Sequence, residues 1–180
     1  MIIVCVPLFT LSSLAQWQSI GNVDTIKRDP GGLTISSGHA KIQIQVISPD
    51  VIRIRLSTSG QFQQDSSWAV ISQVLGDHSF VVAETTDEIK LSTSLLRVQV
   101  KKAPCRIAFL DTSGTVINQD EPSKGICWTS NGEVAVWKTL PQGELYYGFG
   151  EKAGSLLKNG KMMSMWNTDK IGRASCRERV

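Results

Sequence analysis

The sequence predicts an all-β protein, an antiparallel β-sandwich, and three observations support this fold class. Apolar and polar residues alternate along several segments, which is typical of strands with one buried face. Turn-forming residues recur about every 8–12 positions, as they do in β-sandwiches. No segment before residue 145 has a convincing helical period.

The clearest predicted element is a hairpin within residues 41–56. Apolar and polar residues alternate there on both sides of a turn at 48–50, which indicates two half-buried strands. Residues 95–102 repeat the alternation. Residues 105–120 predict a second hairpin, which turns at 111–114, where Asp, Ser and Gly favour a turn. Further short strands are predicted at 32–37, 79–86, 88–94, 125–130 and 133–140.

The first fifteen residues predict a secretory signal peptide. They are uncharged and apolar from Ile2 to Leu14, and the small residues Ser13 and Ala15 occupy the −3 and −1 positions of a cleavage site. We therefore expect a secreted or periplasmic protein that is cleaved after Ala15. An apolar run of 13 residues is too short to span a bilayer, so no stable membrane anchor is expected. A buried first strand is the alternative interpretation.

The basic residues of the chain are concentrated at its end. Residues 171–180 contain three Arg and one Glu, so they carry most of the formal net charge of +3. A nucleic-acid surface needs basic residues clustered on a folded face, so no nucleic-acid partner is expected. Residues 171–180 also match one reading frame of a common sequencing adapter, and we exclude them from the predicted fold as an expected artefact. A disordered basic tail or a nucleic-acid arm is the alternative.

Cysteine and histidine residues indicate no metal or cofactor site. Apart from the cysteines near the two ends, the sequence has Cys105 and Cys127. They either pair in an oxidising compartment or remain separate buried thiols. His39 and His78 are far apart and lack neighbouring ligands, so neither a zinc site nor a Ser/His/Asp triad is predicted.

Residues 148–153, GFGEKA, fit the weak form of a dinucleotide-binding fingerprint. That fingerprint needs a preceding parallel strand and a following βαβ unit, whereas the preceding chain is predicted antiparallel and only 27 residues follow. We therefore interpret Gly148 and Gly150 as turn residues at a strand end.

Tryptophan side chains are candidates for stacking on sugar rings. Trp68, Trp128 and Trp137 lie in strand patterns, so we interpret them as core or sheet-face residues. Trp166 lies outside the strand patterns beside polar residues, where a core position and a ligand contact are equally favoured. The Asp residues are scattered at predicted turns, so no pair of glycosidic carboxylates is evident from the residues alone.

The segment before the tail carries a family resemblance. Residues 147–152 read YGFGEK, and residues 165–169 read MWNTD. Together they resemble the end of the N-terminal domain of family 31 glycoside hydrolases, the α-glucosidase and α-xylosidase group. Weaker similarity extends upstream, so the resemblance covers roughly residues 20–169.

The resemblance implies a galactose-mutarotase-like β-sandwich at residues 16–145 and a substrate-facing loop at 146–170. It also implies a following (β/α)₈ barrel that carries two catalytic Asp residues and hydrolyses α-glucosides or α-xylosides with retention. By motif position, Asp169 contacts the bound sugar, and Trp166, Asn167 and Thr168 lie beside it. A carboxylate suits this role because it accepts hydrogen bonds from two hydroxyls.

The expected barrel is missing from this sequence. Such a barrel needs about 250 residues, whereas 11 follow Asp169. We therefore expect an N-terminal fragment of a secreted family 31 α-glycosidase that contributes carbohydrate binding and has no hydrolytic activity by itself. The alternatives are a separate, non-catalytic carbohydrate-binding module and a structural β-sandwich without a ligand.

Overall fold

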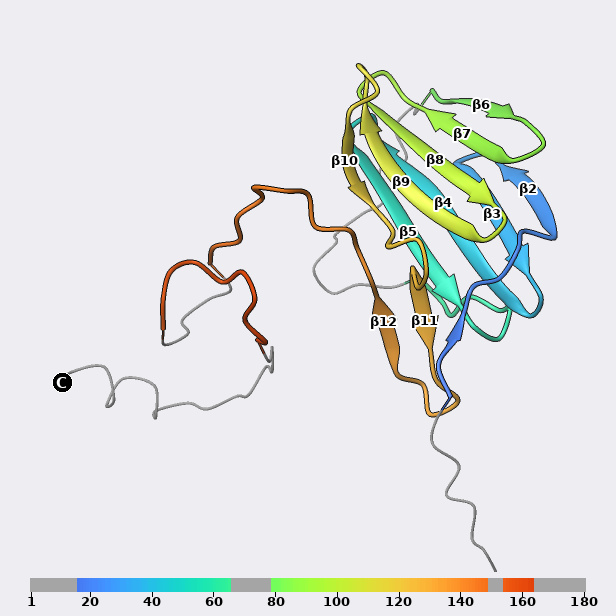
Figure 1. The fold of residues 1–180 in the computed structure, drawn as a ribbon. Coiled ribbons are helices and arrows are strands. Elements are labelled where there is room, and N and C mark those ends of the chain that lie inside the picture. Colours follow the sequence, from blue (N-terminus) through green and yellow to red (C-terminus); the bar gives the residue numbers. More distant parts are fainter. Residues whose placement is uncertain (1–15, 66–78, 149–153, 164–180) are drawn as a thin grey trace, which may run out of the picture. The chain divides into compact units, whose positions relative to one another are not determined.

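The computed structural model of the 180-residue chain describes residues 16–65, 79–148 and 154–163. The chain divides after Thr139 into two compact units. The first unit contains every strand of the described residues, so the all-β prediction is confirmed. These strands belong to three antiparallel sheets (Figure 1). The described residues contain no helix that is long and apolar enough to cross a membrane.

The four-stranded sheet has the order β2-β3-β4-β5. Its strands are β2 (Thr25–Asp29), β3 (Gly32–Ser37), β4 (Ala40–Ser48) and β5 (Val51–Ser57). Strands β4 and β5 form the hairpin predicted around residues 48–50. Leu33 pairs with Ile44, and Ile44 pairs with Ile54, so the register aligns the apolar residues of three strands on one face.

The five-stranded sheet has the order β10-β9-β8-β7-β6. Its strands are β6 (Val81–Glu84), β7 (Glu88–Ser92), β8 (Leu96–Lys102), β9 (Cys105–Asp111) and β10 (Val116–Gln119). Strands β9 and β10 form the second predicted hairpin. Its turn is held by Asp111, whose carboxylate accepts hydrogen bonds from the Ser113 hydroxyl and the Thr115 amide.

The three-stranded sheet has the order β1-β11-β12. Its strands are β1 (Gln18–Ser19), β11 (Ile126–Trp128) and β12 (Val134–Val136). Ser19 pairs with Cys127, and Cys127 pairs with Ala135. Residues from the start of the described chain therefore lie beside residues from the end of the sandwich.

The hydrophobic core lies between the two larger sheets, which face each other in Figure 1. Both sheets direct alternate, fully buried aliphatic side chains into it, as a β-sandwich requires. The three-stranded sheet adds Ile126, the residue after β1 adds Ile20, and the half-buried Trp128 packs against this core. The core therefore unites all three sheets.

Strands β1 and β2 were not expected from the sequence. Strand β2 reads TIKRD and lies at the edge of its sheet, where its side chains are mostly exposed. An edge strand tolerates charged residues because only one of its sides pairs with another strand. Its hydrophobic period is therefore too weak to mark it as a strand.

Gly32 is required by the close approach of β3 to β4. A Cβ atom at Gly32 would lie 1.9 Å from the carbonyl oxygen of Ile44, and its φ of +155° also disfavours a side chain. We expect Gly32→Ala to lower the free energy of unfolding by about 1–3 kcal/mol, because the two strands must separate. Urea unfolding followed by circular dichroism measures this change.

Gly31→Ala is the matched control, because a Cβ atom there meets nothing within 4 Å. Its free energy of unfolding should stay within about 0.5 kcal/mol of the parent value. Equal effects of the two substitutions would contradict the assignment of Gly32 to a steric constraint.

Candidate functional site

The site residues predicted from the sequence, Trp166, Asn167, Thr168 and Asp169, lie outside the described residues. The described parts of the second unit, residues 140–148 and 154–163, lead toward them along the chain. The structure therefore describes the part of the chain that precedes the predicted site residues.

The side chain of Asn159 joins two segments of this second unit. Its Nδ2 donates to the Glu144 carbonyl at 2.8 Å, and its Oδ1 accepts from the Tyr146 amide at 2.7 Å. The Lys158 amide also donates to the Tyr146 carbonyl at 2.8 Å. Gly148 has a φ of +91°, a conformation that favours glycine, although no strand ends beside it in the described residues. The chain leaving at Tyr146 and the chain returning at Lys158 are thus tied together.

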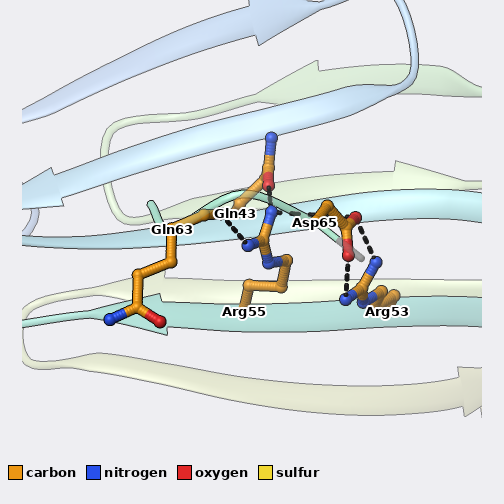
Figure 2. A network of polar contacts seen from close by, with 5 residues as sticks. All are labelled: Gln43, Arg53, Arg55, Gln63 and Asp65. Carbon is orange, nitrogen blue, oxygen red and sulfur yellow. Dashed lines mark hydrogen bonds and ion pairs between the residues drawn. The ribbon is translucent and has the colours of Figure 1, made fainter. Parts of the chain in front are cut away.

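A polar network covers the outer face of the four-stranded sheet (Figure 2). Arg53 donates to both carboxylate oxygens of Asp65, at 2.5 and 2.8 Å, and this bond raises the pKa of Arg53. Arg55 donates to the Gln63 carbonyl at 2.8 Å and more weakly to Gln43 at 3.4 Å. Figure 2 shows the side chains of Gln43, Arg53, Arg55 and Asp65 gathered together, whereas the Gln63 side chain points away and only its backbone carbonyl takes part.

This network fixes the loop that follows β5. Besides the bonds to Asp65 and Gln63, the Arg55 guanidinium lies 5.2 Å from the centre of the Phe62 ring, and the Ser57 hydroxyl donates to the Gln61 carbonyl. The bidentate pair with Asp65 uses the planar geometry of a guanidinium. The charged groups of Arg53, Arg55 and Asp65 already have partners within the protein, so we assign the network a structural role.

A hollow of about 240 Å³ lies on the outer face of the five-stranded sheet, and Asp120 and Arg106 are among its lining residues. The side chain of Asp120 is only 2% exposed. Its carboxylate accepts hydrogen bonds from the Ile107 amide at 2.8 Å and from Lys138 Nζ at 2.7 Å. Because both oxygens are engaged, Asp120 is poorly placed to act as a general acid or base.

The buried guanidinium of Arg106 donates to four backbone carbonyls. Nε donates to Pro122 at 2.9 Å, and Nη2 donates to Ser123 at 3.0 Å. Nη1 donates to Cys105 at 2.7 Å and to Ile20 at 3.4 Å. Arg106 therefore links β9 to the residue after β1 and to the turn before β11.

Cys105 and Cys127 are both buried free thiols. Burial and, to a lesser degree, the charge of Asp120 raise the pKa of the Cys105 thiol to about 12. Cys127 donates its S–H to the Lys124 carbonyl. A thiol that stays protonated is a poor nucleophile and a poor metal ligand, so Cys105 has a packing role. Within the described ranges, no three His, Cys, Asp or Glu residues gather as metal ligands.

The sequence and the fold match proteins of one family. Residues 41–175 match the family described as the glycosyl hydrolase 31 N-terminal galactose mutarotase-like domain. The chain belongs to this domain family. Alpha-glucosidase 2 of Bacillus thermoamyloliquefaciens is 31% identical to it over 150 residues, which are 83% of this chain and 19% of the relative.

Solved structures agree with the assignment to the family 31 domain. A Flavobacterium johnsoniae family 31 dextranase, in complex with isomaltotriose, has a TM-score of 0.76 and 31% identity over 85% of this chain and 19% of its own length. A Xanthomonas citri family 31 α-xylosidase, at 23% identity over 75% of this chain and 16% of its own length, has a TM-score of 0.63 and shows the fold alone. This chain therefore spans under a fifth of these proteins.

Three polar residues that organise the family 31 domain were not singled out from the sequence: Arg106, Asp120 and Asn159. Arg106 and Asp120 lie in or beside strand patterns, where a charged residue is usually interpreted as solvent-facing. The available signal for Arg106 was its position in the second hairpin, between the apolar residues Cys105 and Ile107. Their partners are mostly backbone groups, which a sequence pattern does not specify.

We expect Arg106→Met to lower the free energy of unfolding of the 180-residue chain by at least about 2 kcal/mol. The methionine keeps the apolar stem but leaves buried carbonyls without a donor, and hydrogen bonds to charged groups contribute about 1.5–3 kcal/mol. Urea unfolding measures this loss. Arg28→Met is the matched control, because Arg28 is exposed and its ion pair with Glu84 is long, at 4.0 Å. Its effect on the free energy of unfolding should be near zero. Equal stability of the two variants would contradict the role of Arg106.

Cys105 should resist alkylation in the folded chain. Because its pKa is raised to about 12 from the usual 9.0, iodoacetamide at pH 8 should modify it only after unfolding in urea, as peptide mass spectrometry can show. In the unfolded chain the Cys105 thiol has the usual pKa of 9.0, so it loses its proton at a lower pH than in the folded chain. The stability that the neutral thiol contributes is therefore present below pH 9.0 and is lost as the pH rises toward about 12. Rapid labelling of native Cys105 at pH 8 would contradict this account.

Proposed function

We propose that this chain is the N-terminal domain of a secreted, retaining α-glycosidase, and that it contributes carbohydrate contacts to that enzyme. The observation that carries the proposal is the family match over residues 41–175. Further support comes from a relative named as an α-glucosidase and from a dextranase solved with isomaltotriose, both at 31% identity. An α-glucoside is therefore the substrate class we propose.

Within this proposal, Asp169 accepts hydrogen bonds from hydroxyls of the sugar held by the catalytic barrel. Trp166 packs beside the sugar, and Asn167 and Thr168 complete the contact. The preceding chain is tied together where the structure describes it, because Asn159 bonds to the backbone of Glu144 and Tyr146.

The test uses the full-length gene product, expressed in a secreting host, with isomaltotriose as the substrate. We expect Asp169→Ala to lower kcat/KM by about tenfold to a hundredfold, because it removes charged hydrogen bonds worth about 1.5–3 kcal/mol. The effect should be smaller in Asp169→Asn, which keeps an acceptor oxygen. Initial rates of glucose release measure both effects.

Asp50→Ala is the control, because Asp50 is exposed in the β4–β5 turn, and its kcat/KM should equal that of the parent enzyme. The 180-residue chain alone should release no glucose. Full activity of Asp169→Ala would refute the sugar contact.

The predicted signal peptide is tested on the same secreted enzyme. N-terminal sequencing should start at Gln16, and an uncleaved start at Met1 would refute the signal peptide.

A further inference from the structure

Two exposed tryptophans line one hollow on the outer face of the three-stranded sheet. The hollow measures about 340 Å³, and its lining is Trp17, Ser19, Ser123, Lys124, Cys127 and Trp137. Trp17 is 51% exposed and Trp137 is 45% exposed. Typical small-molecule sites measure about 300–1,000 Å³ and combine apolar walls with a few polar groups, and this hollow meets that description.

The indoles of Trp17 and Trp137 serve no core role that would explain them. The opposite face of the same sheet contributes Ile126 to the core, next to Ile20 directly after β1, and Trp128 packs against that core. Trp128 and Trp137 therefore have different environments although both were interpreted alike from the sequence. Large, half-exposed aromatic side chains that gather at one hollow are typical of binding surfaces.

The wall of the hollow formed by Trp137 is held rigidly by its backbone. The Trp137 amide donates to the Gly125 carbonyl at 2.8 Å, and the Glu121 amide donates to the Trp137 carbonyl at 2.9 Å. The ammonium of Lys124 lies 4.1 Å from the centre of the Trp137 ring, which is within the range of a cation–π contact. Trp137 is thus fixed before any ligand arrives.

The turn that carries Lys124 is fixed as well. The carboxylate of Glu121 accepts hydrogen bonds from the Ser123 hydroxyl at 2.7 Å, the Ser123 amide at 3.0 Å and the Lys124 amide at 2.8 Å. From the other side, Arg106 donates to the carbonyls of Pro122 and Ser123. A site restrained in this way costs little entropy to organise on binding.

We propose that this hollow binds a neutral gluco-oligosaccharide through stacking on Trp17 and contact with the indole of Trp137, one face of which Lys124 covers. The C–H face of a pyranose ring carries a weak positive potential, which suits the negative face of an indole. Lys124 donates hydrogen bonds to sugar oxygens, and the Ser19 hydroxyl both donates and accepts. The Ser123 hydroxyl already donates its hydrogen to Glu121, so it accepts from a sugar hydroxyl. The proposal rests on the proposed function, which identifies glucosides as the ligand class.

The charge of the hollow disfavours cationic ligands. Its lining carries the ammonium of Lys124 and no carboxylate, so a cationic ligand would be repelled. A proline-rich peptide also docks on aromatic side chains, but the three polar groups of Ser19, Ser123 and Lys124 match the many hydroxyls of a sugar better. The peptide therefore serves as a competing outcome of the test.

The test is a titration of the 15N-labelled 180-residue chain with isomaltotriose, followed through the tryptophan indole N–H signals in 1H–15N spectra. Trp17→Phe and Trp137→Phe assign their signals by loss of one peak each. We expect the signals of Trp17 and Trp137 to shift with one shared, saturable curve, and the signal of the inward-facing Trp128 to stay in place.

Alanine variants then measure the contribution of the indoles. Trp137→Ala should weaken isomaltotriose binding about tenfold, equivalent to about 1.4 kcal/mol, and Trp137→Phe should restore part of the affinity. Val81→Ala is the control, because Val81 is 70% exposed on β6 and should leave binding unchanged.

Absence of indole shifts at Trp17 and Trp137 with isomaltotriose would overturn the inference, as would shifts produced only by a proline-rich peptide. The assay of Asp169→Ala in the full-length enzyme remains separate. If that variant loses activity while the two indole signals stay in place, sugar binding in the hollow is refuted and the proposed function stands. If the indole signals shift while Asp169→Ala keeps full activity, sugar binding in the hollow stands and the proposed sugar contact of Asp169 is refuted.

Discussion

The arrangement of the three-stranded sheet depends on the hydrogen bonds that the guanidinium of Arg106 donates to backbone carbonyls. The guanidinium satisfies backbone carbonyls from three places in the chain: Ile20 after β1, Cys105 on β9, and the turn at 122–123. Buried carbonyls need donors, and one planar cation with several fixed N–H groups supplies them together. The three-stranded sheet therefore docks on the larger sandwich through a polar contact as well as through its apolar face.

The same contact determines what the outer surface offers to a ligand. The turn held by Arg106 carries Lys124, and Lys124 lies over the ring of Trp137. The carboxylate of Glu121 binds the turn from within, and hydrogen bonding to Ser123 lowers the pKa of that carboxyl. A single buried residue thus connects the internal packing of the domain to a hollow on its surface. The wall at Trp137 is built before a ligand binds.

Much of the fold was predictable because apolar side chains recur at every second residue of a strand that has one buried face. The hairpins β4–β5 and β9–β10 were expected from that alternation and from the turn residues between them, and both are confirmed. Strand β2 was missed because an edge strand does not need the alternation. The candidate site was predictable only as a motif at 165–169, and its geometry lies outside the described residues. The roles of Arg106 and Asn159 depend on backbone partners that no local pattern encodes.

The sequence by itself determined the alternating core of the sandwich and, through YGFGEK and MWNTD, the family to which the domain belongs. Only the tertiary structure decided that Trp128 faces the core while Trp17 and Trp137 line a hollow. It also decided that Cys105 and Cys127 are free thiols. The physical reason is that alternation is a local property of one strand. Contacts between distant residues follow from strand order and register, which are set when all three sheets pack together.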